Sequence, residues 1–77
     1  MRIETAAVIA AHNEGPVIAG TVGHLAQRTG AVYVIADHCT DATARLAAQA
    51  GARVYERHQG PGGKGAALAW FVEVAAE

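Results

Sequence analysis

The chain has 77 residues, of which 52% are hydrophobic and 17% are charged, and its formal net charge is -1. This composition is too apolar for a disordered segment, and its apolar runs are too short for a membrane span, which needs about 20 apolar residues in a row. The charge balance argues against a sequence-independent nucleic-acid binder, which would carry a concentrated basic face.

Three apolar runs of β-strand character alternate with three stretches of helical periodicity, and no linker separates them. The first run, Ala6 to Ala11, is apolar on both faces, as in a parallel strand covered by helices on each side. Gly15 and Pro16 mark the start of a helix, and Gly30 suits a left-handed residue that ends it. The inner face of this helix is expected to hold Ile18, Val22 and Leu25.

The second apolar run is Val32 to Ala36, and the turn after it carries "DHCTD". Thr40 is a natural N-cap for the next helix, and Asp41 adds a charge that favours the helix dipole. Gly51 is expected to stop this helix. Its inner stripe is predicted to consist of Thr43, Leu46, Ala47 and Ala50.

The third run, Arg53 to Glu56, leads into the glycine-rich "RHQGPGGKG". A third amphipathic stripe is predicted at Leu68, Phe71, Val72 and Ala75. The whole series predicts one α/β unit, a Rossmann-like three-layer βαβαβα arrangement with a parallel sheet and right-handed crossovers. In such sheets ligands bind beyond the carboxyl ends of the strands, so "AHNEG", "DHCTD" and "GPGGKG" should meet at one edge.

Two charged residues at this edge have both a functional and a structural interpretation. Asp37 follows the second strand, where a carboxylate can accept hydrogen bonds from a base N–H or a sugar hydroxyl; alternatively, it only caps the turn. Lys64 lies in "GGKGAAL", where glycines admit a ligand close to the backbone and a lysine can meet a phosphate. This segment lacks the GxxxxGK[ST] spacing of a phosphate loop, so a flexible connector is the alternative. No GxGxxG supports a dinucleotide site.

The histidines and the single cysteine do not predict a metal centre. They show no recurrent ligand spacing and no CxxC or HExxH pattern, although His12, His38, His58 and Cys39 fall near one edge. Cys39 is expected to pack in its turn rather than act as a nucleophile. One cysteine also favours a reducing compartment, the cytoplasm, or the membrane surface in a longer parent protein.

Three pieces of the chain, "VIAAHNEG", "VIADHCTDATARLAAQAG" and "GGKGAAL", together resemble the start of a family 2 glycosyltransferase with the GT-A fold. The resemblance covers nearly the whole chain but only the front portion of such a catalytic domain. The family's second motif usually has two acids; here Ala36 replaces the first and Asp37 matches the second. The first motif has a small residue, an aromatic residue or His, then Asn and Glu, and is matched by Ala11, His12, Asn13 and Glu14.

The resemblance implies that residues 1–77 form the incomplete, nucleotide-binding amino-terminal part of a GT-A domain. It implies that Asp37 contacts the nucleobase, usually uracil, with His12 beside it, and that Lys64 lies near the base and phosphates. The expected donor is a UDP-sugar, whose sugar the complete enzyme would transfer with inversion to the hydroxyl of an unknown acceptor. The predicted donor-binding residues are Ala11, His12, Asn13, Glu14, Asp37 and Lys64.

Two further motifs of the family are missing from the chain. Family members carry a DxD motif that holds Mg²⁺ or Mn²⁺ against the diphosphate, and a later acid that acts as general base. We therefore expect no catalytic residue, no metal ligand and no sugar transfer by this chain alone. The family also places a further strand beside the first one, so the first strand should be an open edge able to pair with another chain. The alternative from another class is a non-catalytic, truncated module that binds a nucleotide or a protein.

Overall fold

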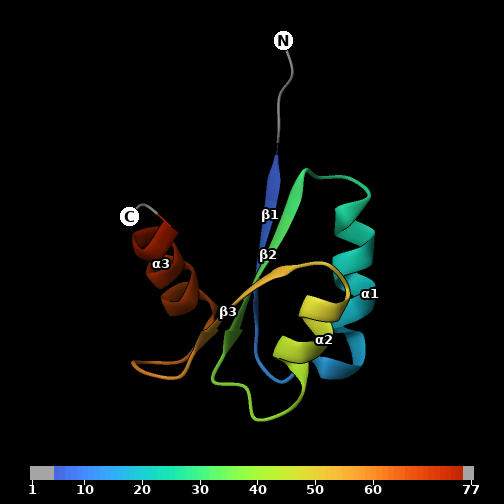
Figure 1. Ribbon diagram of the computed structural model, residues 1–77. Coiled ribbons are helices and arrows are strands. Elements are labelled where there is room, and N and C mark those ends of the chain that lie inside the picture. The colour runs from blue at the N-terminus through green and yellow to red at the C-terminus, as the bar shows by residue number, and fades with distance from the viewer. Residues whose placement is uncertain (1–4, 76–77) are drawn as a thin grey trace.

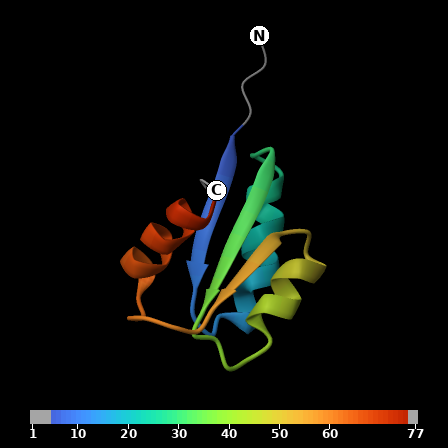
Figure 2. The same ribbon diagram turned by 60° about the vertical axis from the view of Figure 1, so that its left-hand side comes forward.

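The computed structural model describes residues 5–75 as a three-layer α/β unit. A parallel sheet of order β1-β2-β3 has α1 and α2 on one face and α3 on the other (Figures 1 and 2). The predicted βαβαβα fold class is therefore confirmed. The elements are β1 (Ala6–Ala11), α1 (Gly15–Ala26), β2 (Ala31–Asp37), α2 (Thr43–Gln49), β3 (Arg53–Arg57) and α3 (Lys64–Ala75).

The central strand β2 is the most buried part of the sheet. It pairs in parallel with β1, where Ala11 lies opposite Ala36, and with β3, where Asp37 lies opposite Arg57. All residues from Val34 to Asp37 are buried. The strand is one residue longer at each end than predicted, so Asp37 is the last residue of the strand and not the first of the turn. Within the described sheet β1 is an outer strand, as expected, and so is β3.

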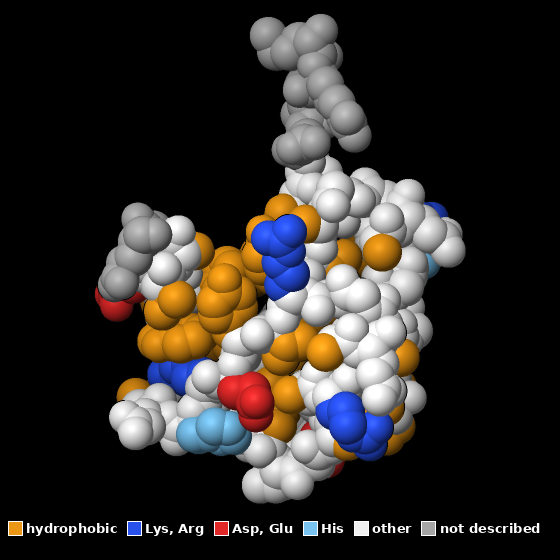
Figure 3. Space-filling view, viewed as in Figure 1, with side chains coloured by type: hydrophobic (Ala, Val, Ile, Leu, Met, Phe, Trp, Pro, Cys, Tyr) orange, Lys and Arg blue, Asp and Glu red, His pale blue; other side chains and the backbone are white. Residues whose placement is uncertain are grey.

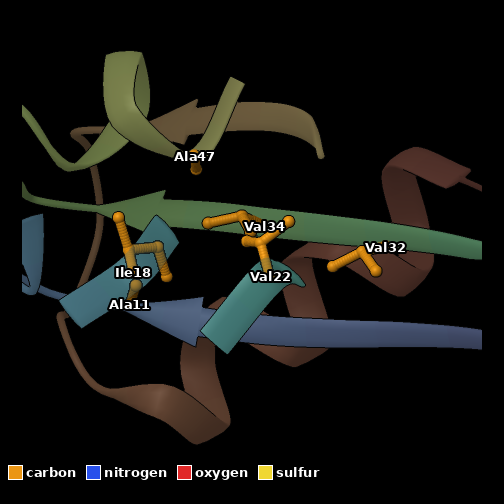
Figure 4. Close-up of a cluster of buried hydrophobic side chains, with 6 residues drawn as sticks. All are labelled: Ala11, Ile18, Val22, Val32, Val34 and Ala47. Atoms are coloured by element: carbon orange, nitrogen blue, oxygen red, sulfur yellow. The ribbon is translucent and has the colours of Figure 1, made fainter. Parts of the chain in front are cut away.

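The larger hydrophobic core lies between the sheet and the pair α1 and α2. Figure 4 shows its buried side chains, which come from the strands β1 and β2 and from the helices α1 and α2. Ile18 and Val22 are one helical turn apart and both point at the sheet, as the predicted stripe requires. The buried members of this core are Ala11, Ile18, Val22, Val32, Val34 and Ala47.

The smaller core lies under α3 and is rich in aromatic rings. Ala67 and Phe71, spaced by four residues, bury their side chains against Ala10 and Ile35. The rings of Tyr55 and Phe71 meet edge to face with centroids 5.2 Å apart. In Figure 3 hydrophobic side chains gather between α3 and the sheet, which shows that this core remains open on one side.

The predicted inner stripe of α3 is wrong at three of its four positions. Leu68 is 40% exposed and Val72 is 66% exposed, and Ala75 is exposed as well. The buried face runs through Ala67 and Phe71 because the small Ala67 lets the helix approach the sheet closely while Phe71 fills the space beyond it. Apolar residues surround much of this helix, so periodicity alone could not select the contact face.

Two predicted helix boundaries are also wrong. Gly30 does not end α1 in a left-handed conformation, because the helix ends at Ala26 and Gln27 follows in right-handed geometry. Thr40 is not the N-cap of α2, which begins three residues later. Gly51 does follow α2 with φ of 105°, as expected for a left-handed stop. None of the helices within residues 5–75 has the length and apolar character needed to cross a membrane.

Neighbouring residues on α1 provide a test of where the core lies. Ile18 is 1% exposed and Val17 is 57% exposed. We expect Ile18→Val to lower the free energy of unfolding by about 0.5–1.5 kcal/mol, although it removes only one methyl group. Val17→Ala removes more atoms but should change it by less than about 0.5 kcal/mol. Urea unfolding measures both, and a larger loss from Val17→Ala would contradict this packing.

Candidate functional site

The three turns that follow the strands meet at the carboxyl edge of the sheet, at its lower end in Figure 2. They enclose a cavity of about 390 Å³. This size lies within the range of small-molecule sites. Of the six predicted donor-binding residues, five line the cavity and Asn13 does not. The lining residues are Ala10, Ala11, His12, Glu14, Asp37, His38, Gly62, Gly63 and Lys64.

The Asp37 carboxylate is the buried anion of the cavity wall, with only 3% of the residue exposed. Its Oδ1 accepts a hydrogen bond of 2.7 Å from Nη1 of Arg57, and its Oδ2 accepts one of 3.1 Å from the backbone N–H of Gly63. Burial raises the pKa of Asp37, but the hydrogen bonds from Arg57 and Gly63 and the positive charge of Arg57 outweigh it and leave the pKa below its ordinary value. The carboxylate is therefore ionised at neutral pH.

Arg57 is a second charged residue of the site, paired with Asp37, and it is absent from the residues predicted from the sequence. It is the last residue of β3 and lies directly opposite Asp37 in the sheet. A basic residue at the carboxyl end of a strand, beside an acid in the same position of the neighbouring strand, is the signal that would have found it. In the sequence, Arg57 stands at the start of the glycine-rich "RHQGPGGKG", which hides its place at the end of a strand.

His12 fixes the first turn against the end of β2. Its side chain is exposed toward the cavity mouth, and Nδ1 donates a hydrogen bond of 2.9 Å to the backbone oxygen of Asp37. Because a carbonyl oxygen only accepts, this contact places a proton on Nδ1. Ala11 lines the cavity, and its backbone oxygen accepts a hydrogen bond from Sγ of Cys39 at 3.4 Å. Cys39 thus packs in its turn.

Asn13 braces two turns and does not face the cavity. Its Oδ1 accepts hydrogen bonds from the backbone N–H groups of Thr40 at 2.8 Å and Asp41 at 3.3 Å. Asn13 has φ of 50°, a left-handed conformation that Asn tolerates better than most residues. This side chain explains why Thr40 is not an N-cap, since Thr40 is drawn toward the first turn.

Asp41 holds the beginnings of two helices. Its Oδ1 accepts from the backbone N–H and the hydroxyl of Thr43, and its Oδ2 accepts from the backbone N–H of Gly15 at 3.1 Å. Hydrogen bonds from the side chain and the backbone of Thr43 lower the pKa of Asp41 the most, and the one from Gly15 adds to them. Burial acts to raise this pKa, but the pKa stays below its ordinary value. The prediction that Asp41 supports the start of α2 is borne out, and its link to α1 is new. A Cβ at Gly15 would lie 2.9 Å from Oδ2, which explains the glycine.

Lys64 begins α3 and reaches across the cavity toward β1. Its Nζ donates a hydrogen bond of 2.7 Å to the backbone oxygen of Ala10 and lies 3.5 Å from Oε2 of Glu14. Its side chain is nevertheless 73% exposed, so the ammonium group sits at the mouth of the cavity. Lys64 and Asp37 therefore line one cavity at the carboxyl edge of the sheet, where the sequence predicts that their turns meet.

His38 is the strained residue of the site. Its φ is 52°, and its Nε2 is buried without a hydrogen-bond partner and lies 3.7 Å from Oδ1 of Asp37. Left-handed geometry in a non-glycine residue costs energy and tends to occur at functional sites. Within residues 5–75, no group of three or more His, Cys, Asp or Glu is placed to hold a metal ion.

These features define a Rossmann-like α/β unit with a small-molecule cavity at the carboxyl edge of its sheet. No protein-family model and no curated protein matches the chain. A solved structure described as the crystal structure of a mycobacterial protein has a TM-score of 0.76 and 27% identity over 96% of this chain. The chain covers only 28% of that protein's length. The similarity supports the fold described above.

Asn13 offers a test of the brace between the first two turns. Asn13→Gly keeps the left-handed conformation but removes the acceptor for two N–H groups, and we expect it to lower the free energy of unfolding by about 1 kcal/mol. Asn13→Ala should cost about 1–2 kcal/mol more, because alanine disfavours this conformation. Urea unfolding of both variants measures the difference. If the alanine variant is as stable as the glycine variant, the left-handed conformation at position 13 is not strained for alanine and the expectation is wrong.

Acid unfolding tests the two aspartates. Because the pKa values of Asp37 and Asp41 are lowered in the folded state, the unfolded chain binds more protons and stability rises with pH. Their contribution is complete above the unfolded aspartate pKa of about 4 and is lost as pH falls through the folded values. The free energy of unfolding of the wild type should thus exceed that of Asp41→Asn by the largest amount above pH 5. In urea titrations this difference should disappear below pH 3. Glu73 is exposed on α3, so Glu73→Gln is the control. A stability difference between the wild type and Asp41→Asn that grows in acid would contradict the lowered pKa of Asp41.

Proposed function

We propose that this chain is the nucleotide-binding part of a family 2 glycosyltransferase domain, and that its ligand is a nucleotide-sugar donor, a UDP-sugar first of all. One observation carries the proposal. The residues of three separate motifs that resemble the family, represented by His12, Asp37 and Lys64, line a single cavity. A resemblance in sequence alone would not require residues from three turns to share one wall.

The cavity has the chemistry to hold a nucleotide at both ends. Asp37 is ionised and carries more lone pairs than its two protein partners use, so it can accept a hydrogen bond from the N–H of a pyrimidine base. Lys64 places an ammonium group at the mouth, where a diphosphate would meet it as a point charge. Ala10, Ala11 and the exposed His12 line the cavity between them.

In the complete enzyme, this part would orient the donor for displacement of the nucleoside diphosphate by an acceptor hydroxyl, with inversion at the sugar carbon. A divalent metal would offset the charge that develops on the leaving diphosphate. The described residues offer no metal-binding group, and the chain has no DxD. The role proposed for these residues is therefore donor binding and orientation.

One observation favours a second candidate, a non-catalytic, truncated module that binds a nucleotide or a protein without the help of Asp37. Both oxygens of Asp37 already have protein partners, as they would in a residue kept only to hold the fold together. Under this candidate the carboxylate stabilises the junction of β2, β3 and α3 and has no ligand.

Calorimetry with UDP and uridine separates the two candidates. We expect UDP to bind the wild-type chain and Asp37→Asn to weaken both ligands about tenfold or more, because a hydrogen bond to a charged group contributes about 1.5–3 kcal/mol. Lys64→Met should weaken UDP and leave uridine unchanged, because only UDP carries phosphates. Glu73→Gln is the matched control for Asp37→Asn and should bind UDP like the wild type.

Circular dichroism of each variant establishes that the fold is retained. If UDP and uridine fail to bind the folded wild-type chain, or if Asp37→Asn binds both as tightly as the wild type, the nucleotide pocket is wrong. An equal loss of UDP and uridine in Lys64→Met would remove the phosphate role of that lysine.

A further inference from the structure

Arg57 lies behind Asp37, which lines the cavity, and does not itself line the cavity. The residue is 7% exposed and does not line the cavity, yet its Nη1 donates the 2.7 Å hydrogen bond to Oδ1 of Asp37. Within residues 5–75, Asp37 is the one side chain to which Arg57 hydrogen-bonds, and the buried Nε has no partner. The guanidinium is thus committed to a single carboxylate.

The surrounding backbone holds Arg57 in this place. It is paired with Asp37 in the sheet, and its carbonyl oxygen accepts a hydrogen bond of 2.7 Å from the N–H of His38. A Cβ at Gly60 would lie 3.1 Å from Nη2 of Arg57, and Gly60 has φ of 82°. The glycine-rich turn therefore leaves room for the guanidinium, and a larger residue at position 60 would crowd it.

We propose that Arg57 is a positioning residue for the ligand: from behind the wall it keeps the Asp37 carboxylate ionised and turned so that its remaining lone pairs accept from a donor in the cavity. This inference rests on the proposed function for its ligand, although the effect of Arg57 on Asp37 is independent of any ligand. Arg57 itself does not contact the nucleotide.

The charges around Asp37 show why Arg57 is needed. His38 comes directly after the end of β2, and its Nε2 lies 3.7 Å from Oδ1 of Asp37. His12 contacts only the backbone oxygen of Asp37. Lys64 of α3 contacts Ala10 and Glu14. Burial is the largest single influence on the pKa of Asp37, and it acts to raise it. Without Arg57 the buried acid would hold its proton more strongly, and a protonated oxygen donates where the ligand N–H needs an acceptor.

The first measurement is an NMR titration of the Asp37 side-chain carboxyl in three proteins. In the wild type and in Arg53→Met we expect the pKa of Asp37 to lie below the ordinary aspartate value. Arg53→Met is the matched control because it removes the same charge from the same strand, where that guanidinium lies over the ring of Tyr33. In Arg57→Met the pKa of Asp37 should rise relative to the wild type, because burial then acts without the hydrogen bond and charge of Arg57.

The second measurement is the affinity for UDP at pH 7.5 and pH 5.0. Because UDP itself titrates, the readout is the dissociation constant of each variant for UDP divided by that of the wild type at the same pH. For Arg57→Met this ratio should rise from pH 7.5 to pH 5.0, since each pH unit below the pKa of an essential carboxylate removes a factor of ten of its ionised form. For Arg53→Met the ratio should stay constant.

Arg57→Lys is the variant to use if Arg57→Met does not fold. It keeps the positive charge but lacks the planar fork, so we expect UDP to bind about tenfold more weakly at both pH values with no change in the pH ratio. An Asp37 pKa that stays low in Arg57→Met, or wild-type affinity in Arg57→Lys, would overturn the inference. If UDP fails to bind the wild type while the pKa of Asp37 still depends on Arg57, the proposed function fails and the pairing stands.

Discussion

A buried carboxylate must be neutralised or richly hydrogen-bonded, and in this molecule the requirement falls on Asp37. Its partners come from the end of β3, through Arg57, and from the turn before α3, through Gly63. Removing one partner of such a pair leaves an uncompensated charge, which typically costs about 3–5 kcal/mol. A chain of 77 residues has little stability to spare. This interaction therefore fixes the ends of β2 and β3 against the turn before α3, and with them the part of the cavity wall that Asp37 forms.

Much of this arrangement follows from local features of the sequence. Strand-like runs, two of them apolar on both faces, alternate with helical stripes, and such a pattern permits few folds other than a parallel sheet with helices on both faces. Once the strands are parallel, the turns after them must meet at one edge. The meeting of Asp37 and Lys64 at one cavity was therefore predictable without knowing any side-chain contact, because strand direction alone brings their turns together.

What the sequence could not supply depends on contacts between distant residues. Thr40 looks like an N-cap, but Asn13, 27 residues earlier, accepts its backbone hydrogen bond and draws it away from the helix. The inner face of α3 depends on how closely the helix can approach the sheet at Ala67, a property of two surfaces rather than of one periodicity. Arg57 was overlooked for a similar reason, because its importance appears only when β3 is aligned with β2.

The role of Asp37 in the fold is compatible on physical grounds with the role that we propose for it toward a ligand. A carboxylate has about four acceptor directions, and the contacts with Arg57 and Gly63 occupy one on each oxygen. The same two contacts lower the pKa of Asp37, so they preserve the charge that makes the remaining directions useful. Lys64 differs from Asp37 in this respect, because an incoming phosphate could replace its contacts with Ala10 and Glu14. A nucleotide would thus find its base acceptor already fixed, whereas its phosphate partner would have to exchange one set of contacts for another.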